Sequence, residues 1–323
     1  MVDAGQKTEQ NAGTAPYRSI CRSNSEVRVT HTFANQNADR LRTLLSRDGI
    51  IKMPCCFDAL SARLIEKAGF DLTFLSGFGA SASRLGAPDT GLMSYGEVLD
   101  QARNAMQPIS IPMIADGDTG YGNPMNILRT VEGFARAGCA AVMIEDQVAP
   151  KRCGHTEGKS TVSRAEAAER IHAAVEARAG HDILILARTD ARREHGLDEA
   201  LARIEIFSKL GADILFVEEP YSIEEMTAIC ESVDGYHMAN MLEGGQTPIL
   251  PPEELSEIGF KIAAYPLTLL SAAMKAMNTV LKQLAEGSSS EMHLMDFAEL
   301  REQIGFDEYH SKANALSAKT ASE

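Results

Sequence analysis

The sequence predicts an α/β protein of the (β/α)₈ class, also called a TIM barrel, and three observations support this prediction. First, about eight short apolar runs alternate with helical stretches between residues 50 and 266. Second, these runs are apolar on both faces, which is typical of strands in a parallel sheet covered by helices. Third, about eight such units in roughly 240 residues fit a closed barrel better than an open sheet.

A doubly wound open sheet is the alternative architecture. Such a sheet often carries the glycine-rich motif GxGxxG after an early strand, or the phosphate-binding motif GxxxxGK[ST] between a strand and a helix. The chain has no GxGxxG after an early strand and no phosphate-binding motif of this type. The closed barrel is therefore the preferred prediction.

Each expected strand is a short run rich in aliphatic and β-branched residues. Most of the runs end in a polar or charged residue after an apolar body, so polar side chains are expected at one end of the barrel. In chain order, the strands are expected at residues 50–55, 72–77, 111–118, 140–147, 182–190, 212–219, 236–242 and 260–266.

The expected helices carry ordinary boundary signals. Pro124 stands at the start of one helix and Ser163 caps another, because proline suits the first helical turn and serine suits the N-cap. A further helical segment at residues 291–316 can pack on the same subunit or on a neighbouring one. Glycines close four of the helices, which are expected at residues 58–69, 124–138, 163–180 and 197–211.

The chain is expected to divide into three parts. Residues 1–40 are polar and aperiodic, which predicts a disordered or extended N-terminal segment. Residues 41–286 form the catalytic barrel, and residues 287–323 form a C-terminal helical segment. Acidic residues in the first part argue against a transit peptide. A cytoplasmic location is therefore expected, with organellar targeting by the N-terminal segment as the alternative.

Charge and cysteine content narrow the class of partner. The formal net charge of −14 argues against nucleic acid or an anionic membrane as the main partner, so an anionic substrate has to be bound by a local cationic site. No apolar run is long enough to cross a bilayer. The six cysteines are scattered without CxxC pairs, which is typical of reduced thiols.

Polar residues end six successive expected strands. One such residue is usually a helix cap or a turn residue. Six in succession indicate an active site, because the strand ends of a barrel meet at one mouth. They are Ser76 and Gly77, Asp116 and Asp118, Glu145 and Asp146, Arg188 and Asp190, Glu218 and Glu219, and Asn240.

Three of these residues predict a metal site. Asp116 and Asp118 stand two residues apart, and Glu145 follows the next strand. An oxygen-only cluster of this kind suits Mg²⁺ or Mn²⁺ better than Zn²⁺. Arg188 ends a strand as well, where a guanidinium can grip a substrate carboxylate or pair with one of the nearby acids.

The segment "KRCGH" places a cysteine among cations. Cys153 follows Lys151 and Arg152, and Lys159 lies nearby in the same glycine-containing loop. Positive charge stabilises a thiolate, so the pKa of Cys153 is expected to be lowered. His155 can act as a proton shuttle or can hold the loop in place.

Six motifs resemble one enzyme family. They are "SGFGASASRLGAPDTG", "ADGDTGYGNP", "IEDQVAPKRCGH", "ARTDA", "LFVEEP" and "ANMLEGGQTP", in family order over residues 45–285. The chain resembles the isocitrate lyase/phosphoenolpyruvate mutase superfamily, and "KRCGH" resembles the signature of its lyases. The resemblance implies a (β/α)₈ barrel, a Mg²⁺ ion, a mobile loop bearing Cys153, and a homotetramer with exchanged C-terminal helices.

The resemblance also implies a reaction and roles for individual residues. The family's lyases cleave the C2–C3 bond of a 2-hydroxy dicarboxylate, and Cys153 resembles the general acid that protonates the departing carbanion. The implied catalytic residues are Cys153, His155, Arg188 and Glu218. The implied substrate-binding residues are Ser76, Gly77, Phe78, Gly154, Asn240, Met241, Leu242 and Pro266, and the implied metal-binding residues are Asp116, Asp118, Asp89 and Glu145.

Differences within the family favour a 2-alkylmalate such as 2,3-dimethylmalate as the substrate. Ser271 and Phe297 stand where the 2-methylisocitrate branch carries arginines for a third carboxylate. "NMLEGG" resembles the form of 2,3-dimethylmalate lyase and of petal death protein, and Pro266 stands where oxaloacetate hydrolases carry serine. The alternatives are 2-methylisocitrate lyase, oxaloacetate hydrolase and, least favoured, a non-catalytic binding protein. The retention of Cys153, Asp116 and Asp118 speaks against the last.

Overall fold

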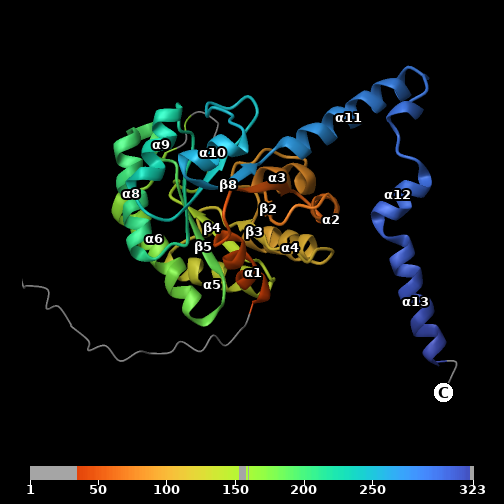
Figure 1. Cartoon of the computed structure of the whole chain (residues 1–323), viewed down its shortest axis with the longest axis horizontal. Helices are drawn as coiled ribbons and strands as arrows, with labels where there is room; N and C mark the ends of the chain where they lie inside the picture. Colours follow the sequence, from red (N-terminus) through yellow and green to blue (C-terminus); the bar gives the residue numbers. More distant parts are fainter. Residues whose placement is uncertain (1–34, 153–157, 159, 321–323) are drawn as a thin grey trace, which may run out of the picture. The chain divides into compact units, whose positions relative to one another are not determined.

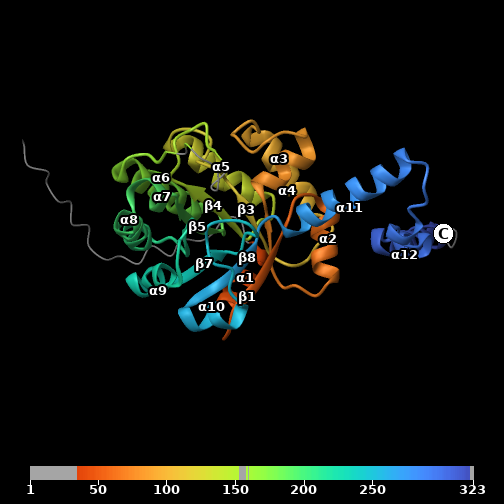
Figure 2. The ribbon, with the colours of Figure 1, turned by 90° about the horizontal axis from the view of Figure 1, so that it is seen from above.

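A computed structural model of the chain describes residues 35–152, 158 and 160–320. Within them the strands form one closed parallel barrel in which each strand pairs with the next and β8 returns to β1 (Figures 1 and 2). The predicted (β/α)₈ barrel is thereby confirmed. The strands are β1 (Ile51–Cys56), β2 (Thr73–Leu75), β3 (Met113–Asp116), β4 (Ala141–Glu145), β5 (Leu184–Thr189), β6 (Ile214–Val217), β7 (Tyr236–Asn240) and β8 (Phe260–Tyr265).

Helices connect the strands and cover the outside of the barrel (Figure 2). Their starts are set by side-chain caps, as where the Asn123 side chain accepts hydrogen bonds from the backbone of the first turn of α5. The connecting helices are α2 (Ala59–Lys67), α3 (Gly77–Leu85), α4 (Tyr95–Met106), α5 (Pro124–Arg136), α6 (Arg164–Ala177), α7 (Ala191–His195), α8 (Leu197–Leu210), α9 (Ile223–Ser232) and α10 (Pro252–Ile258).

One helix begins earlier than the sequence suggested. Helix α1 (Gln36–Leu45) includes residues 36–40, which the sequence analysis assigned to the N-terminal segment. Ala38, Leu41, Leu44 and Leu45 form its buried face, and they join the apolar cluster that fills the barrel interior. Burial of this face holds the segment in a helix although its flanking residues are polar.

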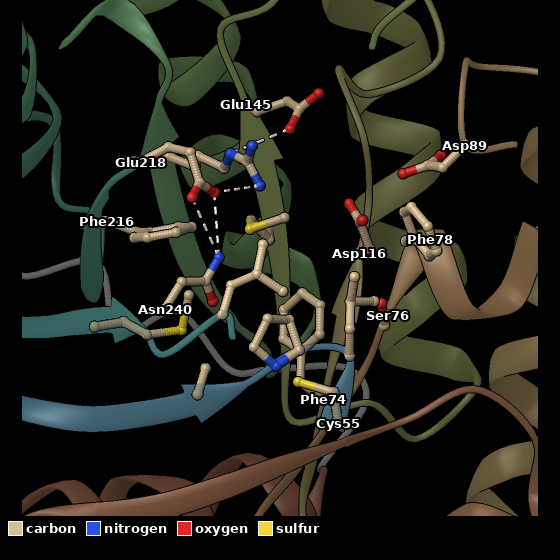
Figure 3. A pocket seen from close by; sticks show the side chains of 18 of the residues that line it. Cys55, Phe74, Ser76, Phe78, Asp89, Asp116, Glu145, Phe216, Glu218 and Asn240 are labelled. Carbon is tan, nitrogen blue, oxygen red and sulfur yellow. Dashed lines mark hydrogen bonds and ion pairs between the residues drawn. The ribbon is translucent and has the colours of Figure 1, made fainter. Parts of the chain in front are cut away.

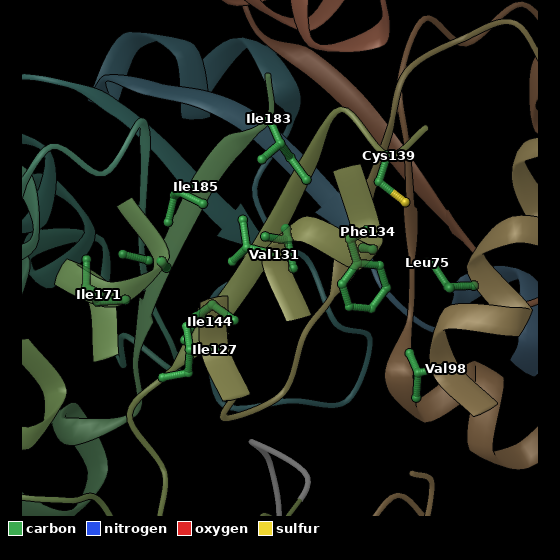
Figure 4. Close-up of a cluster of buried hydrophobic side chains, with 14 of the residues drawn as sticks. Leu75, Val98, Ile127, Val131, Phe134, Cys139, Ile144, Ile171, Ile183 and Ile185 are labelled. Atoms are coloured by element: carbon green, nitrogen blue, oxygen red, sulfur yellow. The ribbon is translucent and has the colours of Figure 1, made fainter. Parts of the chain in front are cut away.

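The core has two layers that follow the alternation of each strand. In β4, Val142 and Ile144 point outward and pack under the helices, whereas Met143 points into the barrel. Figure 4 shows the outer layer, a single apolar cluster that includes Val131 and Phe134 of α5 together with Ile144 and Ile185. Glu145 is one step beyond Ile144, so the same alternation turns it inward at the carboxyl end of the barrel.

Three helices follow the barrel: α11 (Thr268–Ala285), α12 (Phe297–Ile304) and α13 (Phe306–Thr320). Only Leu270 of α11 is buried in the single chain. Arg63 and Lys67 of α2 donate hydrogen bonds to backbone carbonyls of α12 at 3.0 and 2.8 Å. Exchange of these helices between subunits stays a prediction. No helix among the described residues is long and apolar enough to span a membrane.

Candidate active site

A pocket opens at the carboxyl end of the barrel, where the sequence placed the active site (Figure 3). Side chains reach it from the inward-facing positions of successive strands and from the loops that follow them. Among the residues expected from the sequence, those that line this pocket are Ser76, Gly77, Phe78, Asp89, Asp116, Glu145, Arg188, Glu218, Asn240, Leu242 and Pro266.

Five of the residues that were given individual roles from the sequence lie elsewhere or are not described. Met241 does not line the pocket, because its side chain is fully buried in a separate apolar cluster under α9 and α10. Asp118 is buried and does not line the pocket, but its carboxylate contacts Lys151, which does. The catalytic residues expected from the sequence at Cys153 and His155, and the substrate-binding residue Gly154, fall outside the described residues.

Arg188 is the centre of a buried ion-pair cluster. Its Nε and Nη2 atoms donate to the two carboxylate oxygens of Asp190 at 2.8 and 3.0 Å. Nη1 lies 3.0 Å from Oε2 of Glu218, and Nε lies 3.4 Å from Oε2 of Glu145. The guanidinium also stacks over the ring of Phe216. Three carboxylates and one ring therefore set its orientation toward the pocket.

The other polar groups on this side of the pocket complete the cluster. Figure 3 shows Glu145 at the end of β4, Glu218 after β6 and Asn240 at the end of β7 on the same side of the pocket. Nδ2 of Asn240 donates to Oε2 of Glu218 at 3.2 Å. Burial raises the pKa of the Glu145 carboxyl well above its ordinary value, while Arg188 lowers it. No group among the described residues forms a hydrogen bond with the buried Oε1 of Glu145, so this oxygen is open to a further donor or cation.

A second cluster gathers three carboxylates around one ammonium. Nζ of Lys151 lies 2.5 Å from Oδ1 of Asp118, 3.0 Å from Oδ2 of Asp89 and 3.6 Å from Oδ2 of Asp116. Burial alone lowers the pKa of Lys151, but Asp116, Asp118 and the neighbouring acids raise it well above its ordinary value. Lys151 is therefore a cation here. Burial raises the pKa of Asp118 to about 6, and Lys151 opposes this shift.

The backbone around these clusters supports anion binding and carries strain. Ser76 caps α3, its side chain accepting from the backbone of Gly79, so the amino end of α3 lies at the pocket wall. A helix amino terminus attracts negative charge. Asp118, Tyr121 and Glu219 adopt left-handed backbone with φ of 48°, 60° and 59°. Such conformations cost energy and concentrate at functional sites.

Comparisons with known proteins agree with this geometry. The family model described as phosphoenolpyruvate phosphomutase matches residues 41–285. The chain belongs to the phosphoenolpyruvate mutase/isocitrate lyase superfamily. It is 45% identical over 240 residues to 2,3-dimethylmalate lyase of Eubacterium barkeri, covering 74% of this chain and 83% of that protein. It is 37% identical over 277 residues to 2-methylisocitrate lyase of Halalkalibacterium halodurans, with coverages of 85% and 91%.

Solved structures in this superfamily have the same fold. An oxaloacetate acetylhydrolase in complex with the inhibitor 3,3-difluorooxalacetate superposes with a TM-score of 0.83 at 34% identity, covering 87% of this chain and 97% of that one. A phosphonopyruvate hydrolase complex with oxalate and Mg²⁺ gives a TM-score of 0.75 at 26% identity, with coverages of 85% and 97%.

The carboxylates around Lys151 fit the magnesium ion seen in that superfamily member. Asp89, Asp116 and Asp118 already gather around one cation. A Cβ atom on Gly77 would collide with Oδ2 of Asp116, so glycine keeps the approach to this oxygen open. Among the described residues, no three His, Cys, Asp or Glu side chains are placed to hold an ion by themselves. Mg²⁺ usually keeps several water or substrate ligands in addition to those from the protein.

Sequence reasoning missed several residues of this superfamily site. Lys151 was considered only as part of the environment of Cys153, because its approach to Asp89 and Asp118 joins segments far apart in the chain. The apolar lining could have been predicted from strand alternation. Most of its strand residues stand two positions before the polar residue at the strand end, so they face the inside of the barrel as well. The missed lining residues are Cys55, Phe74, Met143, Lys151, Arg152, Phe216, Met238, Ala264 and Leu267.

Proposed function

We propose that this carbon–carbon lyase of the superfamily cleaves the C2–C3 bond of 2,3-dimethylmalate or another 2-alkylmalate. The products are pyruvate or another 2-oxo acid and a short carboxylic acid. The observation that carries the choice of substrate is the mixed lining of the pocket. Its lining combines charged residues, among them Arg188 and Asp116, with an apolar part formed by residues after β7 and β8.

The apolar part suits an alkyl substituent rather than a third carboxylate. Leu242, Pro266 and Leu267 line it and offer no partner to a negative charge. Ser271 and Phe297, the positions considered for a third carboxylate, are exposed and do not line the pocket in the described chain. A carboxylate brought into a closed site without a partner loses several kcal/mol of hydration, about 2–7 kcal/mol for polar groups in general.

The reaction requires two proton movements that balance. The proton of the 2-hydroxyl leaves, C2 becomes a carbonyl carbon, and the electrons of the C2–C3 bond pass to C3. The carboxylate-bearing fragment then takes one proton at C3 and departs as the carboxylic acid. Arg188, Glu218 and Asn240 form one hydrogen-bonded unit that is placed to hold a carboxylate or the hydroxyl. Cys153 is proposed as the acid that protonates C3.

Magnesium is proposed as the cofactor, with Mn²⁺ as a substitute. Asp116 and Asp118 would hold it, with Asp89 and Glu145 in support. A bound Mg²⁺ supplies positive charge against the oxygens of the 2-oxo acid. Independently of the ion, Ser76, Gly77 and the amino end of α3 favour an anionic group at the same wall.

A substrate panel tests the choice of substrate. We expect 2,3-dimethylmalate, or another 2-alkylmalate, to exceed 2-methylisocitrate in kcat/KM by about 10²-fold, which corresponds to roughly 2.7 kcal/mol. The physical reason is that Ser271 and Phe297, the positions considered for a third carboxylate, carry no positive charge. Coupled pyruvate detection with Mg²⁺ present gives the measurement. Equal or better turnover of 2-methylisocitrate would overturn this choice, and release of oxalate and acetate from oxaloacetate would identify the hydrolase alternative.

The general-acid role is tested at Cys153. We expect Cys153→Ser to lower kcat by about 10²-fold or more, the scale of a lost general acid. Alkylation of the thiol should also inactivate the enzyme, and substrate should protect it. Burial raises the pKa of Cys56 and Cys139 to about 12, so these thiols should react slowly at neutral pH.

Cys230→Ser is the matched control for this thiol test. Cys230 lies outside the pocket, and burial raises the pKa of its thiol to about 12. The control variant should keep both its turnover and its sensitivity to alkylation. A near-normal rate in Cys153→Ser would assign the proton to another group.

A homotetramer in the cytoplasm is proposed as the working state. Large apolar side chains stay exposed along α11 and α12 of the single chain, which favours their burial by another copy. Light scattering after size-exclusion chromatography measures the subunit number. The exposed side chains include Met274, Met277, Leu281, Leu284, Phe297 and Leu300.

A further inference from the structure

A buried chain of polar contacts connects helix α8 with the active site, although it does not line the pocket. It begins at Arg203, whose residue surface is only 3% exposed. Nη1 of Arg203 donates to Oδ2 of Asp146 at 2.9 Å. Asp146 is 2% exposed and follows β4 directly, next to Glu145. Neither Arg203 nor Asp146 is among the residues that line the pocket.

Asp146 passes this contact on to the end of β5. Its Oδ2 accepts from Oγ1 of Thr189 at 2.6 Å, and its Oδ1 accepts from the backbone N–H of Asp190 at 2.9 Å. Asp190 is fully buried and holds both Nε and Nη2 of Arg188. The position of the Asp190 backbone therefore sets where the Arg188 guanidinium points.

The other contacts of Arg203 do not explain its burial. Nε of Arg203 donates to Oε1 of Glu199 at 2.8 Å, one turn earlier on α8. Glu199 also pairs with the exposed Arg164, so it has a second cation. In the described part of the chain, Arg203 is the cation that pairs with Asp146, and the other donors to Asp146 are the neutral Thr189 hydroxyl and one backbone amide.

We propose that Arg203 and Asp146 are positioning residues for the lyase reaction, which fix the Thr189–Asp190 segment and thereby aim Arg188 at the substrate. The proposal rests on the proposed function, because Arg188 is there assigned to the reacting centre. A displacement of about 1 Å at a reacting group can cost about 10²-fold in rate, so an outer contact of this kind has a measurable effect.

Three variants separate positioning from a general loss of stability. Arg203→Met removes the guanidinium and keeps much of the side-chain volume, and Arg203→Lys keeps a cation that can reach Asp146. Arg164→Met is the matched control, since it removes the other partner of Glu199 and leaves Asp146 untouched. We expect about a 10-fold to 100-fold loss of kcat/KM for Arg203→Met, partial recovery for Arg203→Lys and less than about 2-fold change for Arg164→Met.

A double-mutant cycle distinguishes a positioning role from a merely structural one. In an Arg188→Lys background the bidentate contact with Asp190 is already lost, so adding Arg203→Met should lower kcat/KM by less than about 2-fold more. A structural role predicts the same additional loss in both backgrounds, together with a parallel fall in melting temperature. Full additivity would overturn the proposal.

Crystal structures of the holoenzyme variants test the same point without relying on turnover. Arg203→Met should show the Asp190 carboxylate and the Arg188 guanidinium displaced from each other, and Arg164→Met should show them unchanged. An unmoved Asp190–Arg188 pair in Arg203→Met would overturn the proposal.

If Arg203→Met does not fold, Thr189→Val removes one donor to Asp146 and takes its place. If the wild type turns over no 2-alkylmalate, the proposed function fails, while the structural result still decides the positioning role.

Discussion

Replacing Arg188 with methionine is expected to abolish lyase turnover and to lower the free energy of unfolding by about 3–5 kcal/mol. The guanidinium offsets the charges of Asp190, Glu218 and Glu145, and all three are buried. The replacement removes the positive charge that offsets these three carboxylates in a poorly hydrated site. Denaturant unfolding and coupled pyruvate detection measure the two effects on the same samples.

Arg192→Met is the matched control for this prediction. Arg192 also makes a bidentate pair, with Glu225 at 2.5 and 2.7 Å, and stacks over Tyr221, but it does not line the pocket. Its replacement is expected to cost about 1 kcal/mol or less, as for an ion pair near the surface, and to leave turnover close to normal. Equal losses of stability in the two variants would contradict the central role given to Arg188.

The stability loss in Arg188→Met should also depend on pH. Burial raises the pKa of Glu145 above its unfolded value, and Arg188 opposes this shift. Without Arg188 the folded-state pKa rises further, so the folded protein binds a proton that the unfolded chain has already lost. Stability therefore falls as pH rises above the unfolded pKa of about 4.3 toward the folded pKa. The wild-type protein follows the same trend up to its own folded pKa of Glu145, so the deficit relative to wild type should widen only above that pKa, as measured by denaturant unfolding at several pH values.

Much of the site could be predicted from strand alternation and chain order. Asp116, Glu145, Arg188, Glu218 and Asn240 each stand two positions after an inward-facing apolar residue, as Glu145 does after Met143. A period of two therefore turns all five into the barrel at the same end. The closed barrel itself followed from the number of apolar runs, because helices cover the outer faces of its strands.

Contacts between distant segments could not be predicted in this way. Lys151 reaches Asp89 across 62 positions, and Arg203 reaches Asp146 across 57. Neither pairing leaves a periodic pattern in the sequence, since each depends on how a loop or an outer helix packs over the barrel. Met241 shows the opposite error. It stands beside Asn240 in a family motif, but its side chain points to the other face of the chain and is buried in an apolar cluster.

Removal of the metal ion is expected to stop turnover without unfolding the protein. After treatment with EDTA and removal of the chelator, we expect less than about 1% of the starting rate, restored by Mg²⁺ or Mn²⁺. The fold should persist, because the ammonium of Lys151 can offset part of the negative charge of Asp89, Asp116 and Asp118 in the metal-free protein. Melting curves recorded before and after treatment check this second point.

Asp116→Asn tests the same site by substitution. The amide keeps the size of the side chain but removes the negative charge, so the variant should lose Mn²⁺ binding, as measured by electron paramagnetic resonance, together with turnover. Asp182→Asn is the matched control, because Asp182 is also buried and paired with a cation, Arg42 at 2.5 Å, but precedes β5 at the amino end of the barrel. The control should bind Mn²⁺ normally. Full activity of the metal-free wild type, or normal Mn²⁺ binding by Asp116→Asn, would refute the metal site.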